Sequence, residues 1–101
     1  MAEIKLELDE RLHGAFNLYE ESNKIGEMVV SVKDDVLTVY HTEVAESAGG
    51  KGYAKELLNT MVAYVRENNL KVRPLCPYVH AQFKRHPDEY NDIWLKTDKD
   101  E

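Results

Sequence analysis

The sequence predicts an α+β fold, a twisted and mainly antiparallel sheet of about five strands with one long and one short helix. Apolar residues recur at every second position through the first half of the chain, which is typical of strands with one buried face. After residue 52 they recur at every third or fourth position, which is typical of an amphipathic helix. The connections within the first half are too short for parallel crossovers, so its strands are expected to pair antiparallel.

Four strands are predicted in the first half, over residues 4–8, 16–19, 28–32 and 36–44. In the first strand Ile4, Leu6 and Leu8 alternate with charged residues, and the fourth strand is rich in β-branched side chains. Turns are expected at residues 21–24 and 33–35, where polar residues interrupt the alternation. These segments together predict an antiparallel meander.

A long helix is predicted over residues 52–68. Its apolar residues between Ala54 and Val65 fall on one face, and its charged residues lie away from that face. Asn68 or Asn69 can supply the left-handed residue that commonly ends a helix. We expect this helix to pack with its apolar face on one side of the sheet.

A strand and a short helix are predicted after the long helix. Residues 70–75 alternate as a short strand, and Pro74 favours the edge of the sheet because proline cannot donate a hydrogen bond to a neighbouring strand. The short helix follows over residues 78–86 and stops before Pro87. The charged residues 96–101 are expected to form a frayed tail.

Composition and charge restrict the kinds of partner. The chain has 101 residues, enough for one domain over residues 1–101, and it carries 13 Lys and Arg against 19 Asp and Glu, a net charge of −6. So acidic a chain does not favour a nucleic-acid backbone, and we expect no nucleic-acid partner. No apolar run approaches the roughly 20 residues of a membrane span, and the start does not resemble a signal peptide, so we expect a cytoplasmic protein with no membrane partner. We also expect a monomer or weak homodimer.

The only cysteine is Cys76, which excludes an internal disulfide and a zinc site built on paired cysteines. Cys76 and His80 are four residues apart and together with His41 could outline a metal site, but no carboxylate completes the set. We therefore expect no bound metal.

The segment between the fourth strand and the long helix predicts an anion site. Gly49, Gly50 and Gly52 lie within four residues, directly before the helix. The N–H groups of a first helical turn lack partners within the helix and lie at the positive end of its dipole, and glycines let an anion approach them closely. The same spacing also suits a flexible turn that caps the helix. The Walker and Rossmann glycine patterns are both absent.

The order of these elements, with the glycine segment at residues 49–54, resembles the GNAT superfamily of acetyl-CoA-dependent N-acetyltransferases. The family signature is Gln/Arg-x-x-Gly-x-Gly/Ala, and Gly52 and Ala54 match its last two positions, whereas Gly49 replaces the Gln or Arg. The segments around the fourth and fifth strands look like those of small single-domain members. The resemblance covers residues 16–90.

The resemblance implies that the protein binds acetyl-CoA between the fourth and fifth strands and transfers the acetyl group to an unidentified amine. Pantetheine would pair with the fourth strand, the pyrophosphate would bind backbone amides of the glycine segment, and the Val44 amide would polarise the thioester carbonyl. The residues that the resemblance assigns to the cofactor are His41, Thr42, Glu43, Val44, Gly49, Gly50, Lys51, Gly52, Tyr53 and Ala54.

Two departures from the family pattern bear on catalysis. Many members carry a tyrosine that donates a proton from the helix after the fifth strand, and Phe83, which cannot donate a proton, takes its place here. Larger members have helices between their first strands that shape the acceptor pocket, and only residues 11–14 could substitute for them. A non-catalytic acyl-CoA-binding or protein-interaction module is therefore the alternative to an enzyme.

Three side chains are candidates for the chemistry. Cys76 lies between the fifth strand and a helix N-terminus, which favours a thiolate, and it could accept the acetyl group or protonate the departing CoA, although many cysteines are simply buried. His41 alternates with Leu37 and Val39, so we expect it on their face, where a neutral imidazole could take a proton from an amine or pack in the core. Tyr78 is a further possible proton donor, or it packs as an aromatic ring.

Overall fold

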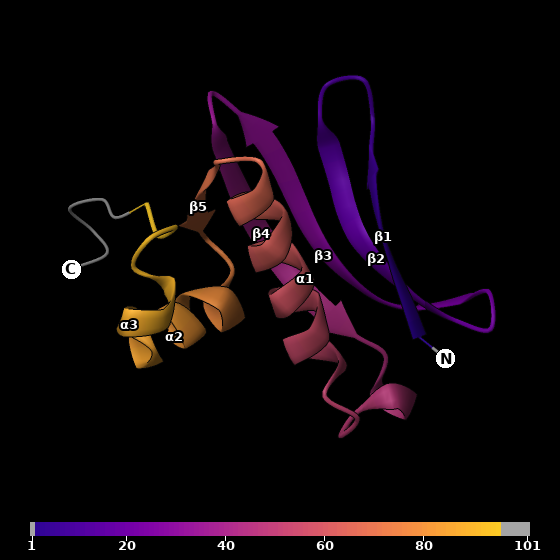
Figure 1. Ribbon diagram of the computed structural model, residues 1–101. Helices are drawn as coiled ribbons and strands as arrows, with labels where there is room; N and C mark the ends of the chain where they lie inside the picture. The colour runs from indigo at the N-terminus through magenta and orange to yellow at the C-terminus, as the bar shows by residue number, and fades with distance from the viewer. Residues whose placement is uncertain (1, 96–101) are drawn as a thin grey trace.

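The computed structural model of the protein describes residues 2–95 and confirms the predicted α+β class (Figure 1). In chain order the elements are β1 (Ala2–Leu8), β2 (His13–Glu20), β3 (Asn23–Lys33), β4 (Val36–Val44), the 3-10 helix η1 (Glu46–Ala48), α1 (Tyr53–Glu67), β5 (Lys71–Pro74), α2 (Pro77–Arg85) and α3 (Pro87–Tyr90). The tail expected at residues 96–101 lies outside the described residues.

The strands form one sheet in the order β1-β2-β3-β4-β5. Neighbours from β1 to β4 pair antiparallel, as predicted for a meander, and β5 pairs parallel to β4 because α1 carries the chain back along the sheet between them. In Figure 1, α1 crosses one face of the sheet, and α2 and α3 lie next to it on the side of β5. Within the described residues no helix covers the other face, which we call the open face.

The covered face holds the hydrophobic core. Alternate residues of β2, β3 and β4 are buried against α1, and the predicted apolar face of that helix is buried along its length. The core side chains of these four elements are Phe16, Leu18, Met28, Val30, Leu37, Val39, Leu57, Leu58, Met61, Val62 and Val65. Burial of this apolar surface is the main source of stability and fixes α1 relative to β4.

The hairpin turns are tighter than predicted. Glu21 and Ser22 alone join β2 to β3, with φ values of 51° and 72°. The expectation that Asn23 and Lys24 belong to this turn is wrong, because both already pair with β2. Residues 34–35 form a second two-residue turn with positive φ. Two consecutive left-handed residues match the twist of the flanking strands, so two residues are enough to reverse the chain.

The helices follow the predicted order, with one addition. Gly52 and Asn68 cap α1, so its predicted extent is confirmed, and Asn69 supplies a left-handed residue at a φ of 56°. The short helix α2 begins and ends one residue earlier than predicted. The four-residue helix α3 was not predicted; Pro87 lies in its first turn, where a missing N–H costs no hydrogen bond. No helix in residues 2–95 is long and apolar enough to cross a membrane.

The chain after α3 returns along the outer side of β5. The Val72 amide donates to the Ile93 carbonyl at 2.7 Å, and the Leu95 amide donates to the Val72 carbonyl at 2.9 Å. Val72 and Trp94 form an isolated parallel bridge. This segment holds the short strand β5 in place from the side away from β4.

Candidate functional site

The candidate site lies where β4 and β5 part. β5 pairs only with residues 36–39 of β4, and the chain then leaves the sheet towards α2. The last link between the two segments is the hydrogen bond from the Cys76 amide to the Val39 carbonyl, at 2.9 Å. Residues 40–44 therefore have β3 on one side and, within the described part of the chain, no strand on the other. We call this unpaired side the open edge of β4.

Backbone groups of β4 alternate between β3 and the open edge. The Ala45 amide donates to the Ile25 carbonyl at 2.7 Å, which places Ala45 on the β3 side of this alternation. The amides and carbonyls of Thr42 and Val44 accordingly face the open edge, whereas those of His41 and Glu43 face β3. An extended ligand can pair with Thr42 and Val44 as a further strand would.

The glycine segment leads from the end of β4 to the N-terminus of α1. Gly50 and Gly52 have φ values of 83° and 76°, which side chains rarely adopt, and nothing lies within 4 Å of where either Cβ would stand. Gly52 is the N-cap residue of α1, but no side chain accepts a hydrogen bond from the first turn, and in this sense we call this end of the helix uncapped. The Glu56 amide donates to the Gly52 carbonyl at 3.1 Å. The amides of residues 53–55 thus have no acceptor within the helix, and an anion can approach them.

The side chains beside this segment carry both charges. The Tyr53 hydroxyl donates to Glu20 at 2.6 Å, and this bond lowers the pKa of Glu20 and raises the pKa of Tyr53. The ammonium of Lys51 lowers the pKa of Glu20 further. Lys51 is exposed just before the uncapped end of α1. Ala54 lies in the first turn of that helix.

Cys76 is buried at the inner end of the open edge, with 2% of its surface exposed. Its Sγ lies 3.4 Å from the hydroxyl oxygen of Thr42, and it caps the N-terminus of α2. Tyr78 follows in the first turn of α2 and is half-buried. Burial raises the pKa of Tyr78, against the effect of the Lys55 ammonium, so the phenol keeps its proton at neutral pH and can only donate it.

Phe83 of α2 and Tyr90 of α3 pack against each other in the core. Phe83 is fully buried, and its ring stacks on that of Tyr90 with the centroids 4.8 Å apart. The Tyr90 hydroxyl accepts a long hydrogen bond of 3.5 Å from Lys55 in the first turn of α1. Sequence reasoning missed this link between α1 and α3, because no periodic pattern marks so short a helix.

His41 does not lie on the face predicted for it. The register between β3 and β4 shifts by one residue, with Val29 opposite His41 and Val30 opposite Val39, so Tyr40 is the extra residue of a β-bulge. The bulge turns His41 to the open face, and the expectation that it shares the buried face of Leu37 and Val39 is therefore wrong.

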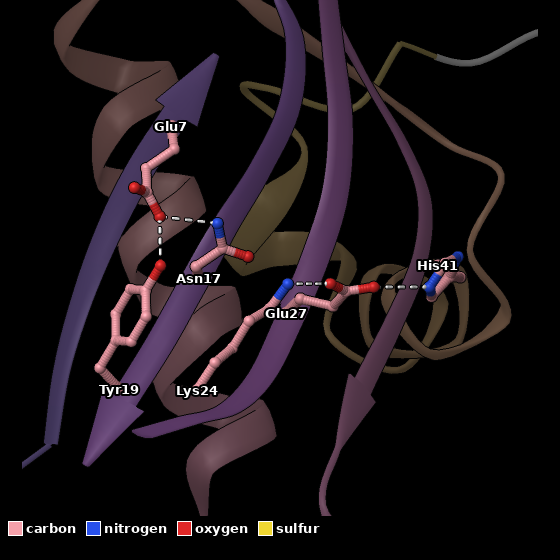
Figure 2. A network of polar contacts seen from close by, with 6 residues as sticks. All are labelled: Glu7, Asn17, Tyr19, Lys24, Glu27 and His41. Atoms are coloured by element: carbon pink, nitrogen blue, oxygen red, sulfur yellow. Dashed lines mark hydrogen bonds and ion pairs between the residues drawn. The ribbon is translucent and has the colours of Figure 1, made fainter. Parts of the chain in front are cut away.

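On the open face His41 joins two carboxylates rather than Cys76. Its Nε2 lies 3.4 Å from Glu27, whose other oxygen accepts a hydrogen bond from Lys24 (Figure 2). The bond from Lys24 is the main reason that the pKa of Glu27 is lowered. Glu27, His41 and Glu43 each offer one atom that could bind a metal ion, and these three atoms lie within 4.8 Å of one another. Exposed acidic groups commonly show such a spacing without an ion.

A second polar network on the open face joins β1 to β2. One carboxylate oxygen of Glu7 accepts hydrogen bonds from Tyr19 at 2.6 Å and from Asn17 at 2.8 Å (Figure 2). The pKa of Glu7 is lowered, mainly by the bond from Tyr19. These contacts order the polar side of the sheet without help from a helix.

The geometry combines three features at one place. An uncapped helix N-terminus can hold an anion, the open edge of β4 can pair with an extended chain, and a buried thiol lies at the inner end of that edge, two residues before Tyr78. A ligand with an anionic group, an amide-bearing arm and a reactive end fits this arrangement.

Comparisons with known proteins identify the family of the chain. A family model described as GCN5-related N-acetyl-transferase matches residues 15–93. A GCN5-like protein from Staphylococcus aureus, solved by NMR, is 31% identical with a TM-score of 0.68, and the match covers 95% of this chain and 90% of that one. No curated protein matches the chain.

Two larger enzymes share the fold at lower identity. The ribosomal-protein-alanine N-acetyltransferase of Brucella melitensis is 21% identical with a TM-score of 0.62, over 88% of this chain and 66% of that one. The ribosomal-protein-S18-alanine N-acetyltransferase of Escherichia coli is 16% identical with a TM-score of 0.60, over 65% of this chain and 43% of that one. The chain thus spans less than half the length of the Escherichia coli enzyme, and these two likenesses concern the fold alone.

Proposed function

The chain belongs to the GCN5-related N-acetyltransferase family, and on that premise we propose that it binds acetyl-CoA and transfers the acetyl group to an amine. The observation that carries this proposal is the uncapped N-terminus of α1 at one end of the open edge of β4. These two features offer donors for a pyrophosphate and for an extended amide chain within one continuous segment of the protein.

The residues present fit acetyl-CoA. The left-handed glycines leave open space above the first turn of α1, where the amides from Gly50 to Ala54 would hold the pyrophosphate and Lys51 would add a screened charge. The backbone of Thr42 and Val44 would pair with the pantetheine arm. Acetyl-CoA supplies an acetyl group activated as a thioester, and the Val44 amide would stabilise negative charge on its carbonyl oxygen.

Cys76 has two possible roles in the transfer. In a direct transfer the amine attacks the acetyl carbon, and Cys76 or Tyr78 gives a proton to the leaving sulfur. In a two-step transfer the Cys76 thiolate would attack the acetyl carbon and displace CoA as a thiolate, which takes a proton; the amine would then attack the acetyl carbon on Cys76, displace the cysteine sulfur and give up a proton that restores the thiol. The Thr42 hydroxyl at 3.4 Å is placed to hydrogen-bond with the sulfur in either route.

The amine must lose a proton, and the bulge places the base candidate His41 on the open face. Glu27 holds the imidazole there, in contact with its Nε2. An acceptor that arrives from the open face would meet His41 before it reaches the buried thiol. The His41 side chain therefore serves the acceptor in this proposal, and its backbone pairs with β3 rather than with the cofactor.

A protein that binds acyl-CoA without turnover is the second candidate function. The buried and stacked Phe83 favours it, because this side chain takes the place of a common family proton donor. Two experiments separate the possibilities. Isothermal titration with CoA tests binding, and an acetyl-transfer assay over a panel of amines tests turnover. No heat of CoA binding would refute both candidates, and binding without transfer to any amine would support the second.

A further inference from the structure

A polar hollow of about 490 Å³ lies on the open face where β3, β4 and β5 meet. Its lining includes six side chains that can donate a hydrogen bond, and Asp34 adds a carboxylate to it; the six are His13, Ser31, Lys33, Thr38, Tyr40 and Arg73. We call it the open-face hollow. None of these side chains is part of the cofactor site described above.

The floor of the hollow is polar and buried. Ser31 and Thr38 are 7% and 8% exposed, and they are the buried polar residues of the described chain. The Ser31 hydroxyl is hydrogen-bonded to the Tyr40 hydroxyl at 2.8 Å. The Thr38 side chain lines the hollow beside them, and its hydroxyl can donate or accept a hydrogen bond there.

The walls of the hollow are basic. Lys33 and Arg73 approach it from β3 and β5, and within the described residues neither forms an ion pair. His13 adds a third nitrogen-bearing side chain, and Asp34 is the one carboxylate of the lining. A basic hollow on a chain with a net charge of −6 points to an anionic ligand.

The hollow and Cys76 lie at the same stretch of β4. The Val39 carbonyl accepts the hydrogen bond from the Cys76 amide, and Val39 is the last residue of β4 that pairs with β5. Its neighbours Thr38 and Tyr40 both line the hollow. A ligand in the hollow would therefore lie beside Thr38 and Tyr40, the two neighbours of the residue to which the Cys76 backbone is hydrogen-bonded.

We propose that the open-face hollow binds the acceptor and that the acceptor carries an anionic carboxylate or phosphate group besides its amine. Arg73 and Lys33 hold the anion, the Thr38 hydroxyl donates to it, and the amine points along β4 towards Tyr40. Thr38 and Tyr40 are two strand residues apart, so the two groups of the ligand should be separated by roughly 7 Å. The acceptor role rests on the proposed function, whereas the anion site does not.

The test is a nuclear magnetic resonance titration of the intact ¹⁵N-labelled chain with three ligands of similar length. These are 4-aminobutyrate, 3-aminopropylphosphonate and butylamine, which carry a carboxylate, a phosphonate and no anion. We expect saturable shifts of the Ser31, Thr38 and Arg73 amides, with at least tenfold tighter binding of one or both anionic ligands than of butylamine. The tighter of the two identifies the anion that the hollow prefers.

Two variants with the same loss of charge provide the control. Arg73→Gln should weaken the anionic ligands at least fivefold, whereas Lys5→Gln, on the same face but on β1, should leave them unchanged. Equal binding of all three ligands, shifts confined to other residues, no saturable shift, or an Arg73→Gln variant that binds normally would each overturn the anion site.

Calorimetry with CoA on the same protein keeps the two proposals apart. If CoA binds and the anionic ligands are not preferred, the inference about the hollow fails and the proposed function stands. If the anionic ligands bind in the hollow but CoA does not bind, the anion site stands and its role as an acceptor site fails. If both bind, acetylation of 4-aminobutyrate faster than of butylamine would support the acceptor role, and the reverse order would overturn it.

Discussion

A negative charge at position 52 is the sharpest test of the cofactor site. Gly52 caps α1 at a φ of 76°, and nothing lies within 4 Å of where its Cβ would stand, so a side chain meets conformational strain but no clash. Among residues with side chains, Asn and Asp tolerate this left-handed region best. Gly52→Asp and Gly52→Asn are therefore a matched pair that differs in charge alone.

The expected difference follows from Coulomb's law. A carboxylate at this position lies about 5 Å from an anion held by the first-turn amides, and at an effective dielectric constant of about 20 two unit charges repel by roughly 3 kcal/mol. This corresponds to roughly a hundredfold change in the dissociation constant. We expect Gly52→Asp to bind CoA about a hundredfold more weakly than Gly52→Asn, with a smaller difference at high salt.

Isothermal titration with CoA measures both dissociation constants, and thermal unfolding checks that both variants fold. Each substitution should cost no more than about 1–2 kcal/mol of stability, because only one residue is placed in the left-handed region. If Gly52→Asp and Gly52→Asn bind CoA equally well at low salt, no phosphate binds at the start of α1, and the proposed pose is wrong.

Three further predictions concern Lys51, Cys76 and Glu27. Lys51→Ala should weaken CoA binding by no more than about tenfold, because an exposed side chain adds only a screened contact to the backbone amides; a hundredfold loss would mean that side chains carry the recognition. Cys76→Ser should keep the CoA affinity within a few-fold and lose most acetyl transfer, and full activity would eliminate both roles of the thiol. In the two-step route, mass spectrometry should also find an acetyl group on Cys76 that forms faster than on the unfolded chain and is removed by an amine. The lowered pKa of Glu27, from an ordinary value of 4.5, means that its ionised form stabilises the fold above pH 4.5 and that this contribution is lost as the pH falls through the lower folded-state value. Urea unfolding should therefore show a difference between the native chain and Glu27→Gln at neutral pH that shrinks in acid, whereas a difference that stays constant would contradict the assignment.

Residue patterns predicted the fold because each predicted element repeats its signal. Ile4, Leu6 and Leu8 mark one face of β1 three times, and the apolar face of α1 recurs over its whole length. The helix α3 has four residues, too few for a period, and only Pro87 marks its start. The limits of α1 were therefore predicted nearly right, whereas β2 and β3 begin three and five residues earlier than predicted, and the short helix α3 was missed.

The sequence predicted only the part of the candidate site whose residues are adjacent in the chain. The glycine segment and α1 are adjacent in sequence, so the uncapped helix end was expected from Gly49, Gly50 and Gly52. The side of the sheet on which His41 lies was not predictable from the sequence. Alternation assumes that no residue is inserted in the strand, and a bulge depends on how two strands pair. The open-face hollow gathers side chains from four strands, and no local pattern brings Arg73 next to Lys33.

The bulge at Tyr40 makes the site depend on the length of β4 as well as on its composition. Without the extra residue, the strand beyond Val39 would exchange its two faces: Thr42 would leave Cys76, and His41 and Glu43 would turn towards the core. A single deletion would thus dismantle the thiol contact and the carboxylate cluster together, although every side chain involved would still be present. Among related chains, the number of residues between the β3–β4 turn and the glycine segment is therefore a stricter marker of this site than the identity of any one of them.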